Sequence, residues 1–177
     1  QRLALVLAYD NVVDDDILVE DDEARQFITA LVLRPGEPNT AGIYAAFRTQ
    51  DHADGRTTEA RAFDFFGQYQ VKLDPKTTLK TALEFALITG ETELAPNPTF
   101  EKHDLLQAGA LWRTSLSKGN YGFINDVLYA SGDQNTDDDQ INQFRVDPNL
   151  ESGLILYRHV LTGVSGHMPI AASDPDL

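Results

Sequence analysis

The stretch Leu79–Glu93 reads LKTALEFALITGETE, and its first half alternates strictly between two kinds of side chain. One phase holds Leu79, Thr81, Leu83, Phe85 and Leu87, and the other holds Lys80, Ala82, Glu84 and Ala86. A period of two is the pattern of a β-strand whose faces meet different surroundings. The apolar face of such a strand either packs into the core of a soluble sheet or meets lipid in a membrane barrel, where the charged face lines a wet lumen.

The same alternation recurs along the chain and predicts seven strands. These are Leu3–Asp10, Gln26–Arg34, Gly42–Gln50, Ala60–Leu73, Thr78–Thr89, Leu106–Leu116 and Tyr121–Ser131. An eighth apolar run, Gly153–Leu161, fits either a strand or an inserted plug, and helical periodicity is poor elsewhere. The fold class predicted is therefore all-β: an antiparallel up-and-down meander that forms a transmembrane β-barrel or part of one, with seven to eight strands.

The predicted connections alternate in length. The long ones are Asn11–Arg25, Asp51–Glu59, Gly90–Asp104 and Gly132–Asn149, and the short ones are Pro35–Thr40, Asp74–Thr77 and Ser117–Asn120. Up-and-down strands place successive connections at opposite ends of the sheet, so one end is expected to carry long loops and the other short turns. Outer-membrane barrels are built in this way, with spanning strands of about 9–11 residues. We expect residues 1–177 to form one domain, with residues 132–150 as a long acidic extracellular loop.

Composition excludes several classes of protein. The formal net charge is −14, from 28 acidic and 14 basic residues, which argues against a nucleic-acid partner because such proteins need basic surfaces. The absence of Cys excludes disulfides and thiolate zinc sites. No run approaches the roughly 18 apolar residues of a transmembrane helix. The opening QRLALVLAYD lacks the basic region and cleavage site of a signal peptide, so we expect a removed signal or a longer parent chain.

The polar phase of the predicted strands mixes charges with Ala and Gly, a mixture more natural in a crowded lumen than on an open surface. The residues predicted to line a lumen and contact a permeant are Arg48, Arg61, Asp64, Lys72, Lys80, Glu84 and Arg113. We also place Asp126 inside. Opposed basic and acidic side chains set an electric field that selects permeants. The alternative is that these residues form the solvated outer face of a soluble sheet.

Aromatic residues fall near several predicted strand ends, namely Tyr9, Tyr69, Tyr121, Phe123 and Tyr129. In a membrane barrel they would form girdles at the level of the lipid headgroups. A second interpretation is that aromatic residues simply favour strands.

No motif predicts catalysis or a cofactor. The acidic run Asp133–Asp139 is no EF-hand, because the places of the required Gly and Glu hold Asp138 and Phe144. Its carboxylates are at most weak ligands for divalent cations, with Asp133, Asp137 and Asp139 as the candidates; a solvated loop is the preferred interpretation. His52, His103, His159 and His167 share no metal-ligand spacing, and no Ser has a nucleophile-elbow context. We expect neither a metal site, nor a cofactor, nor an enzyme.

The last third of the chain resembles bacterial outer-membrane barrels of the alginate-export, porin-like type. The similarity lies in Ser131-Gly132-Asp133 at a strand end, in Phe144 with Asp147-Pro148 after an acidic loop, and in the run Gly153–Leu156. It implies a channel in the outer membrane of Gram-negative bacteria. Family barrels are much longer, and their polyuronate exporters have strongly basic lumens, whereas here Asp64, Glu84 and Asp126 balance the basic residues. The resemblance therefore implies an outer-membrane channel without implying alginate as its cargo.

Three hypotheses follow from the sequence. The first is an outer-membrane channel that contacts lipid and passes small polar or anionic solutes or polysaccharide. The second is a soluble up-and-down barrel that binds a small ligand. The third, weaker one is an outer-membrane enzyme of phospholipase or protease type with its site in the long loops. Behaviour without detergent separates the first two, because only the second should give a monodisperse monomer.

Overall fold

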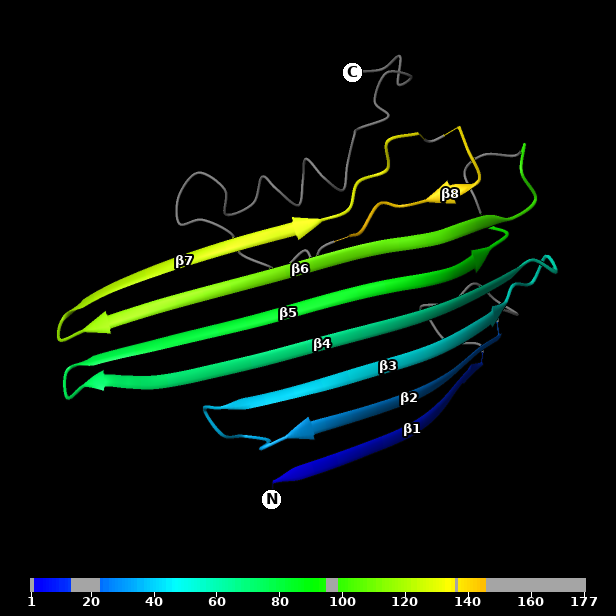
Figure 1. Ribbon diagram of the computed structural model, residues 1–177. Coiled ribbons are helices and arrows are strands. Elements are labelled where there is room, and N and C mark those ends of the chain that lie inside the picture. The colour runs from blue at the N-terminus through cyan, green and yellow to red at the C-terminus, as the bar shows by residue number, and fades with distance from the viewer. Residues whose placement is uncertain (1, 14–22, 95–98, 136, 146–177) are drawn as a thin grey trace, which may run out of the picture. The chain divides into compact units, whose positions relative to one another are not determined.

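The computed structural model describes residues 2–13, 23–94, 99–135 and 137–145, and every regular element in them is a strand. The strands are β1 (Leu3–Val13), β2 (Glu23–Leu33), β3 (Thr40–Asp51), β4 (Thr57–Asp74), β5 (Thr77–Thr92), β6 (His103–Lys118), β7 (Tyr121–Ala130) and β8 (Gln140–Ile141). Strands β1 to β7 form one antiparallel sheet in chain order, as Figure 1 shows. The predicted all-β up-and-down meander is confirmed.

All seven predicted strands are present, and most are a few residues longer than the alternation indicated. The predicted run Gly153–Leu161 lies outside the described residues. Within the predicted loop 132–150, the structure adds β8, which pairs in parallel with β6 at Asp104 and Leu105. Because β8 has only two residues, it shows no alternation from which it could be predicted. Backbone contacts hold it in place, among them the hydrogen bond from Asp104 N to Asp139 O at 2.7 Å.

The connections confirm the predicted asymmetry only in part. One end of the sheet carries residues 52–56 and the described parts of 93–102 and 131–139, and the other carries 34–39, 75–76 and 119–120. Strict alternation is wrong, because residues 52–56 form a shorter connection than residues 34–39. Strands β3 and β4 continue into the predicted loop and reverse through Gly55, whose φ is 84° and whose N–H donates to His52 O. We call the end with residues 93–102 the loop end.

The strands are staggered. The path across the ladders from the middle of β1 runs through Ala8, Ile28, Ala46, Ala62, Ile88 and Gln107. The path thus reaches β6 at Gln107, which lies beyond the end of β7. The middle residue of β7, Asn125, lies opposite Thr114 of β6, seven residues further along that strand. A shift of six to seven residues over six interstrand steps corresponds to a strand tilt of roughly 35–40°, given about 3.3 Å per residue and about 4.8 Å between strands. Strands of closed barrels tilt by about 35–45°.

The described residues form almost no hydrophobic core. The buried hydrophobic residues among them are Ala24 and Ala46, at 2% and 8% exposure. Close contacts divide the chain into Gln1–Gln143, which holds the whole described sheet, and Phe144–Leu177. Hydrogen bonds between strands and packing within each face therefore hold the sheet together, since no second layer is described against it.

Candidate functional site: the two faces of the sheet

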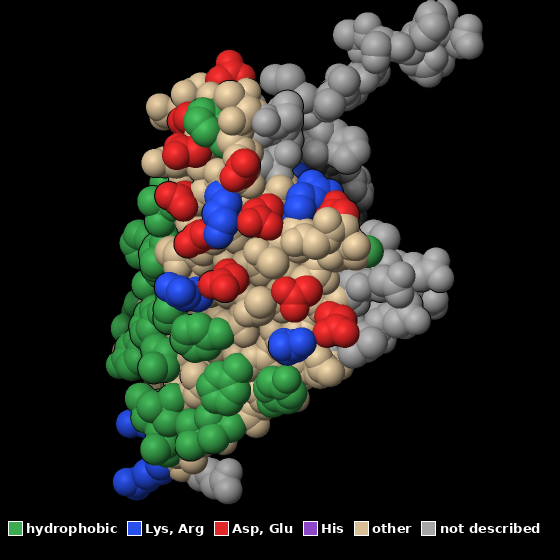
Figure 2. Space-filling view, turned by 90° about the vertical axis from the view of Figure 1, so that its right-hand side faces the viewer, with side chains coloured by type: hydrophobic (Ala, Val, Ile, Leu, Met, Phe, Trp, Pro, Cys, Tyr) green, Lys and Arg blue, Asp and Glu red, His purple; other side chains and the backbone are tan. Residues whose placement is uncertain are grey.

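Cross-strand pairing collects the apolar phases of all seven strands on one side, which we call the apolar face. Its large exposed side chains are Leu3, Leu5, Leu7, Tyr9, Phe27, Leu31, Leu33, Ile43, Phe47, Phe63, Phe65, Tyr69, Leu83, Phe85, Leu106, Trp112, Leu116, Tyr121, Phe123, Val127 and Tyr129. Figure 2 looks from the loop end and shows hydrophobic side chains gathered along one side of the sheet. An exposed apolar patch of this extent is far larger than monomeric soluble proteins present to water, so it requires an apolar partner.

The height of the apolar face follows from the length and the tilt of its strands. On β6 it runs from Leu106 to Leu116, which is ten residue steps. At about 3.3 Å per residue this is roughly 33 Å along the strand, and a strand tilt of about 40° reduces it to a height of roughly 25 Å. The apolar band of outer-membrane barrels is about 25 Å tall.

Aromatic side chains border the apolar face towards the loop end. Tyr9, Phe27 and Phe47 lie side by side on β1, β2 and β3, and Phe47 packs edge-on against Phe63 with ring centroids 6.0 Å apart. The five predicted girdle residues all lie on this face, with Tyr121 the most exposed at 84%. The row through Phe27 and Phe47 was missed, because it is visible only once the strands are in register.

Three polar groups of the apolar face, on β5 and β6, are paired with one another. The indole Nε1 of Trp112 donates to the Thr81 hydroxyl at 2.9 Å, and the hydroxyls of Thr81 and Thr114 lie 3.3 Å apart. Such pairing is what a face in contact with hydrocarbon requires, because lipid tails offer no hydrogen bonds.

The opposite side, which we call the polar face, brings together six of the seven predicted permeant-lining residues. These are Arg48, Asp64, Lys72, Lys80, Glu84 and Arg113. Arg61 lies on the apolar face between Phe47 and Thr89, so the prediction that it shares a face with the others is wrong. Arg61 is two residues before Phe63 on β4, and side chains two residues apart in a strand point to the same face. Arg61 stands where the apolar face meets the charged strand ends, beside Glu59 on the same strand.

Charges on the polar face differ in how they are neutralised. Arg113 binds Asp126 with two hydrogen bonds of 2.7 Å, from Nε to Oδ1 and from Nη2 to Oδ2. Asp126, predicted to lie inside together with Arg113, therefore lies on the same face as Arg113. Within the described part of the chain, Lys80 and Glu84 form no ion pair. Both line a hollow of about 460 Å³ on this side, together with Arg113 and Phe66.

Hydrogen bonds tie the strands together at the loop end of the polar face. The Thr58 hydroxyl lies 2.7 Å from that of Thr92 and 3.2 Å from His52 Nε2. The neighbouring residue on β6 is His103, which is 2% exposed and whose ring nitrogens have no hydrogen-bond partner among the described residues. His103 packs edge-on against Phe100, with ring centroids 5.8 Å apart. These contacts of Thr58 join β4 to β5 and to the turn that contains His52.

Two exposed ion pairs at the loop end shift the pKa values of the side chains that form them. Arg56 donates from Nε to Asp54 Oδ2 at 2.7 Å, and this hydrogen bond lowers the pKa of the Asp54 carboxyl. Lys102 donates to Glu91 at 3.3 Å, which raises the pKa of the lysine. These pairs are exposed and contribute little to stability.

The described residues hold no group of three His, Asp or Glu side chains arranged to bind a metal ion. In the acidic loop, the backbone N–H of Asn135 donates to Asp133 Oδ1, and its side-chain amide donates to Asp138. Asp137 and Asp139 do not join Asp133 in one cluster, and the carboxylates there satisfy local turns.

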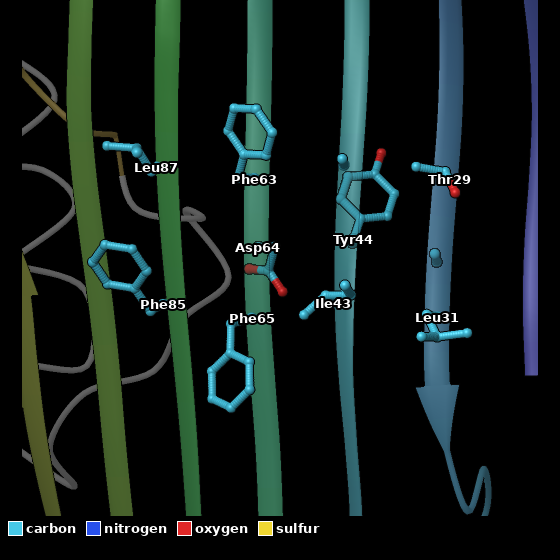
Figure 3. Close-up of a pocket in the computed structure, with 11 residues that line it drawn as sticks. Thr29, Leu31, Ile43, Tyr44, Phe63, Asp64, Phe65, Phe85 and Leu87 are labelled. Atoms are coloured by element: carbon cyan, nitrogen blue, oxygen red, sulfur yellow. The ribbon is translucent and has the colours of Figure 1, made fainter. Parts of the chain in front are cut away.

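A shallow hollow of about 440 Å³ lies on the sheet around Phe63, Phe65, Phe85, Leu31 and Ile43. Figure 3 shows these rings and aliphatic side chains, which come from four neighbouring strands. Its apolar lining suits a hydrocarbon chain better than a polar permeant.

Comparisons of the chain with protein families, with curated proteins and with solved structures found no match. Among the described residues, no helix is long and apolar enough to cross a membrane.

Proposed function

We propose that the protein is a β-barrel channel of the bacterial outer membrane and that the described sheet forms part of its wall. The observation that supports this most strongly is the continuous exposed apolar face backed by a charged one. A soluble sheet buries its apolar face, whereas a barrel in a membrane turns it to hydrocarbon and keeps charges inside. The stagger, the height of the face and the aromatic border add independent support, as does the motif resemblance to alginate-export-type barrels.

We propose that the permeants are small polar or anionic solutes, or polysaccharide. The basic and acidic side chains of the polar face are close to balance, since Arg113 is neutralised by Asp126 and the remaining charges have both signs. We therefore propose weak charge selectivity, set mainly by unpaired groups such as Lys80 and Glu84.

Conductance across planar bilayers tests this proposal. The protein should give discrete channels, and Lys80→Gln should increase the preference for cations over anions by about two- to fivefold, as expected for loss of one charge near the ion path. The matched control is the double variant Arg113→Gln with Asp126→Asn, which removes a neutral pair and should change selectivity much less. Protein that inserts into the bilayer but never conducts would contradict the channel.

A soluble barrel that binds a small apolar ligand is the alternative, and the hollow around Phe63 and Phe85 is the observation in its favour. It requires the apolar face to close on itself around the ligand. Size-exclusion chromatography without detergent separates the two, because a monodisperse monomer that binds a fatty acid supports the alternative and aggregation that lipid reverses supports the channel.

A further inference from the structure

Among the described residues, no strand pairs with the outer edge of β1 or of β7. In an antiparallel ladder, a residue turns its N–H and its C=O towards the same neighbour. Arg34 N donates to Arg2 O, so on β1 the residues of the other phase, from Leu3 to Tyr9, turn their backbone groups to the open edge. Ser131 N donates to Ala108 O, so on β7 the alternate residues Gly122–Ala130 do the same.

Neither edge carries Lys or Pro, two of the residues that most often protect a free edge from pairing, and each strand holds a single Asp, Asp10 on β1 and Asp126 on β7. The sequences of β1 and β7 are LALVLAYDNVV and YGFINDVLYA. On the polar face, the large exposed apolar side chains are Val6, Ile124 and Leu128, all on these two strands. Unpaired backbone groups are costly in hydrocarbon, so a sheet that spans a membrane must have both edges paired.

The direction of the strands restricts what can pair with the edges. β1 and β7 are the first and seventh strands of an antiparallel series, so they run in the same direction (Figure 1). They cannot close on each other as antiparallel neighbours. An all-antiparallel closure needs an odd number of additional strands, which agrees with the even strand numbers of bacterial outer-membrane barrels.

A second copy of the described sheet does not meet this requirement. Copies related by an axis along the membrane normal would place β7 of one beside β1 of the other in parallel. Copies related by an axis in the membrane plane would pair antiparallel, but the loop ends would then lie on both sides of the membrane.

We infer, on the basis of the proposed function, that β1 and β7 are docking edges for an odd number of further amphipathic strands in one closing unit. Each strand that joins an edge runs antiparallel to it. It is about ten residues long, and its apolar phase continues the row of Leu3, Leu5 and Leu7 on one side or that of Phe123 and Val127 on the other. The partner is therefore polypeptide with period-two alternation, other than a second copy of this sheet.

Amide hydrogen exchange of the full protein in phospholipid bicelles tests the inference. Amides of Leu5, Leu7, Ile124 and Leu128 should exchange at least about a hundredfold more slowly than that of Gly55 in an exposed turn. Because the chain has no Cys, the variants Leu5→Cys and Leu128→Cys can be treated with a short bismaleimide, with Leu83→Cys on the central strand β5 as the control. None of the three should cross-link two copies.

The outcomes are distinct. Slow edge amides without cross-linked dimers support the inference. Slow edge amides together with dimers of the Leu5→Cys or Leu128→Cys variant overturn it in favour of closure by a second copy. Fast edge amides in inserted protein overturn it while leaving the membrane location intact. Protein that does not associate with bicelles overturns the proposed function, and this inference with it.

Discussion

The two faces of the sheet differ in a way that ordinary globular sheets do not. On the apolar face Phe65 is 42% exposed, whereas on the polar face Ala46 is 8% exposed. The side with aromatic and aliphatic residues is open, and the side with charges is the more covered one. Charged side chains remain on the polar face because water or a partner charge is available there, as for Arg113 and Asp126. The comparison supports the proposal that hydrocarbon, not a protein core, completes the apolar face.

A charge placed on each face should give the largest difference between them. Phe65→Arg puts a guanidinium in the middle of the apolar face and should destabilise the protein in lipid vesicles by about 2–4 kcal/mol. Gln70→Glu, which places a charge opposite Lys80 on the polar face, is the control and should change the free energy of unfolding by less than about 0.5 kcal/mol. Urea unfolding in vesicles measures both. Equal costs would show that the faces do not differ in their surroundings.

Replacing a glycine by alanine should also have different effects on the free energy of unfolding on the two faces. A Cβ at Gly42, on the polar face, would lie 2.5 Å from Phe66 Cε1 and 3.1 Å from Leu31 O, whereas a Cβ at Gly67, on the apolar face, would find only ordinary contacts with Phe65. Gly42→Ala should therefore cost about 1–3 kcal/mol. Gly67→Ala should be neutral or stabilising by up to about 1 kcal/mol. The same unfolding assay applies, and a neutral Gly42→Ala would contradict crowding on the polar face.

A smaller effect is expected from the paired polar groups of the apolar face. Thr81→Val removes the acceptor of the Trp112 indole and should destabilise the protein by about 0.5–1.5 kcal/mol. The loss should be accompanied by a shift in Trp112 fluorescence. Thr29→Val, on the same face but with no side-chain hydrogen bond among those described, is the control and should be neutral or stabilising in lipid.

The smallest effect should come from a turn that belongs to neither face. The hydrogen bond from Arg56 lowers the pKa of Asp54 in the folded protein, so the ionised carboxylate favours folding. This contribution is present above the unfolded pKa of about 3.9 and is lost as the pH falls through the lower folded value. Unfolding between about pH 2 and 6 should show a slightly weaker acid dependence in Asp54→Asn. An unchanged profile would show that the pair is inert.

Much of the fold follows from the sequence because period-two alternation is a local signal. Leu79–Leu87 alone indicates a strand with two unlike faces, and the same signal finds all seven long strands. Strand ends were less predictable, since polar residues such as those of Thr57–Glu59 extend a strand through pairing with neighbours and not through their own pattern. The two residues of β8 gave no signal for the same reason.

The candidate site was predictable where phase alone decides it. Asp64, Lys80 and Glu84 are out of phase with Phe63 and Phe85, and they lie on the polar face. Arg61 was misplaced because its charge was weighed above its phase. The pairing of Arg113 with Asp126, and the row of Tyr9, Phe27 and Phe47, depend on register between strands, which a single sequence does not specify.

The most direct test uses Trp112, the only tryptophan of the chain, which lies on the apolar face and is 50% exposed. Its fluorescence should be measured in vesicles of phospholipids brominated at different depths of the acyl chain. The account predicts strong quenching by bromines near the middle of the chains and little quenching by acrylamide in the water. Quenching by acrylamide without any effect of brominated lipid would contradict it.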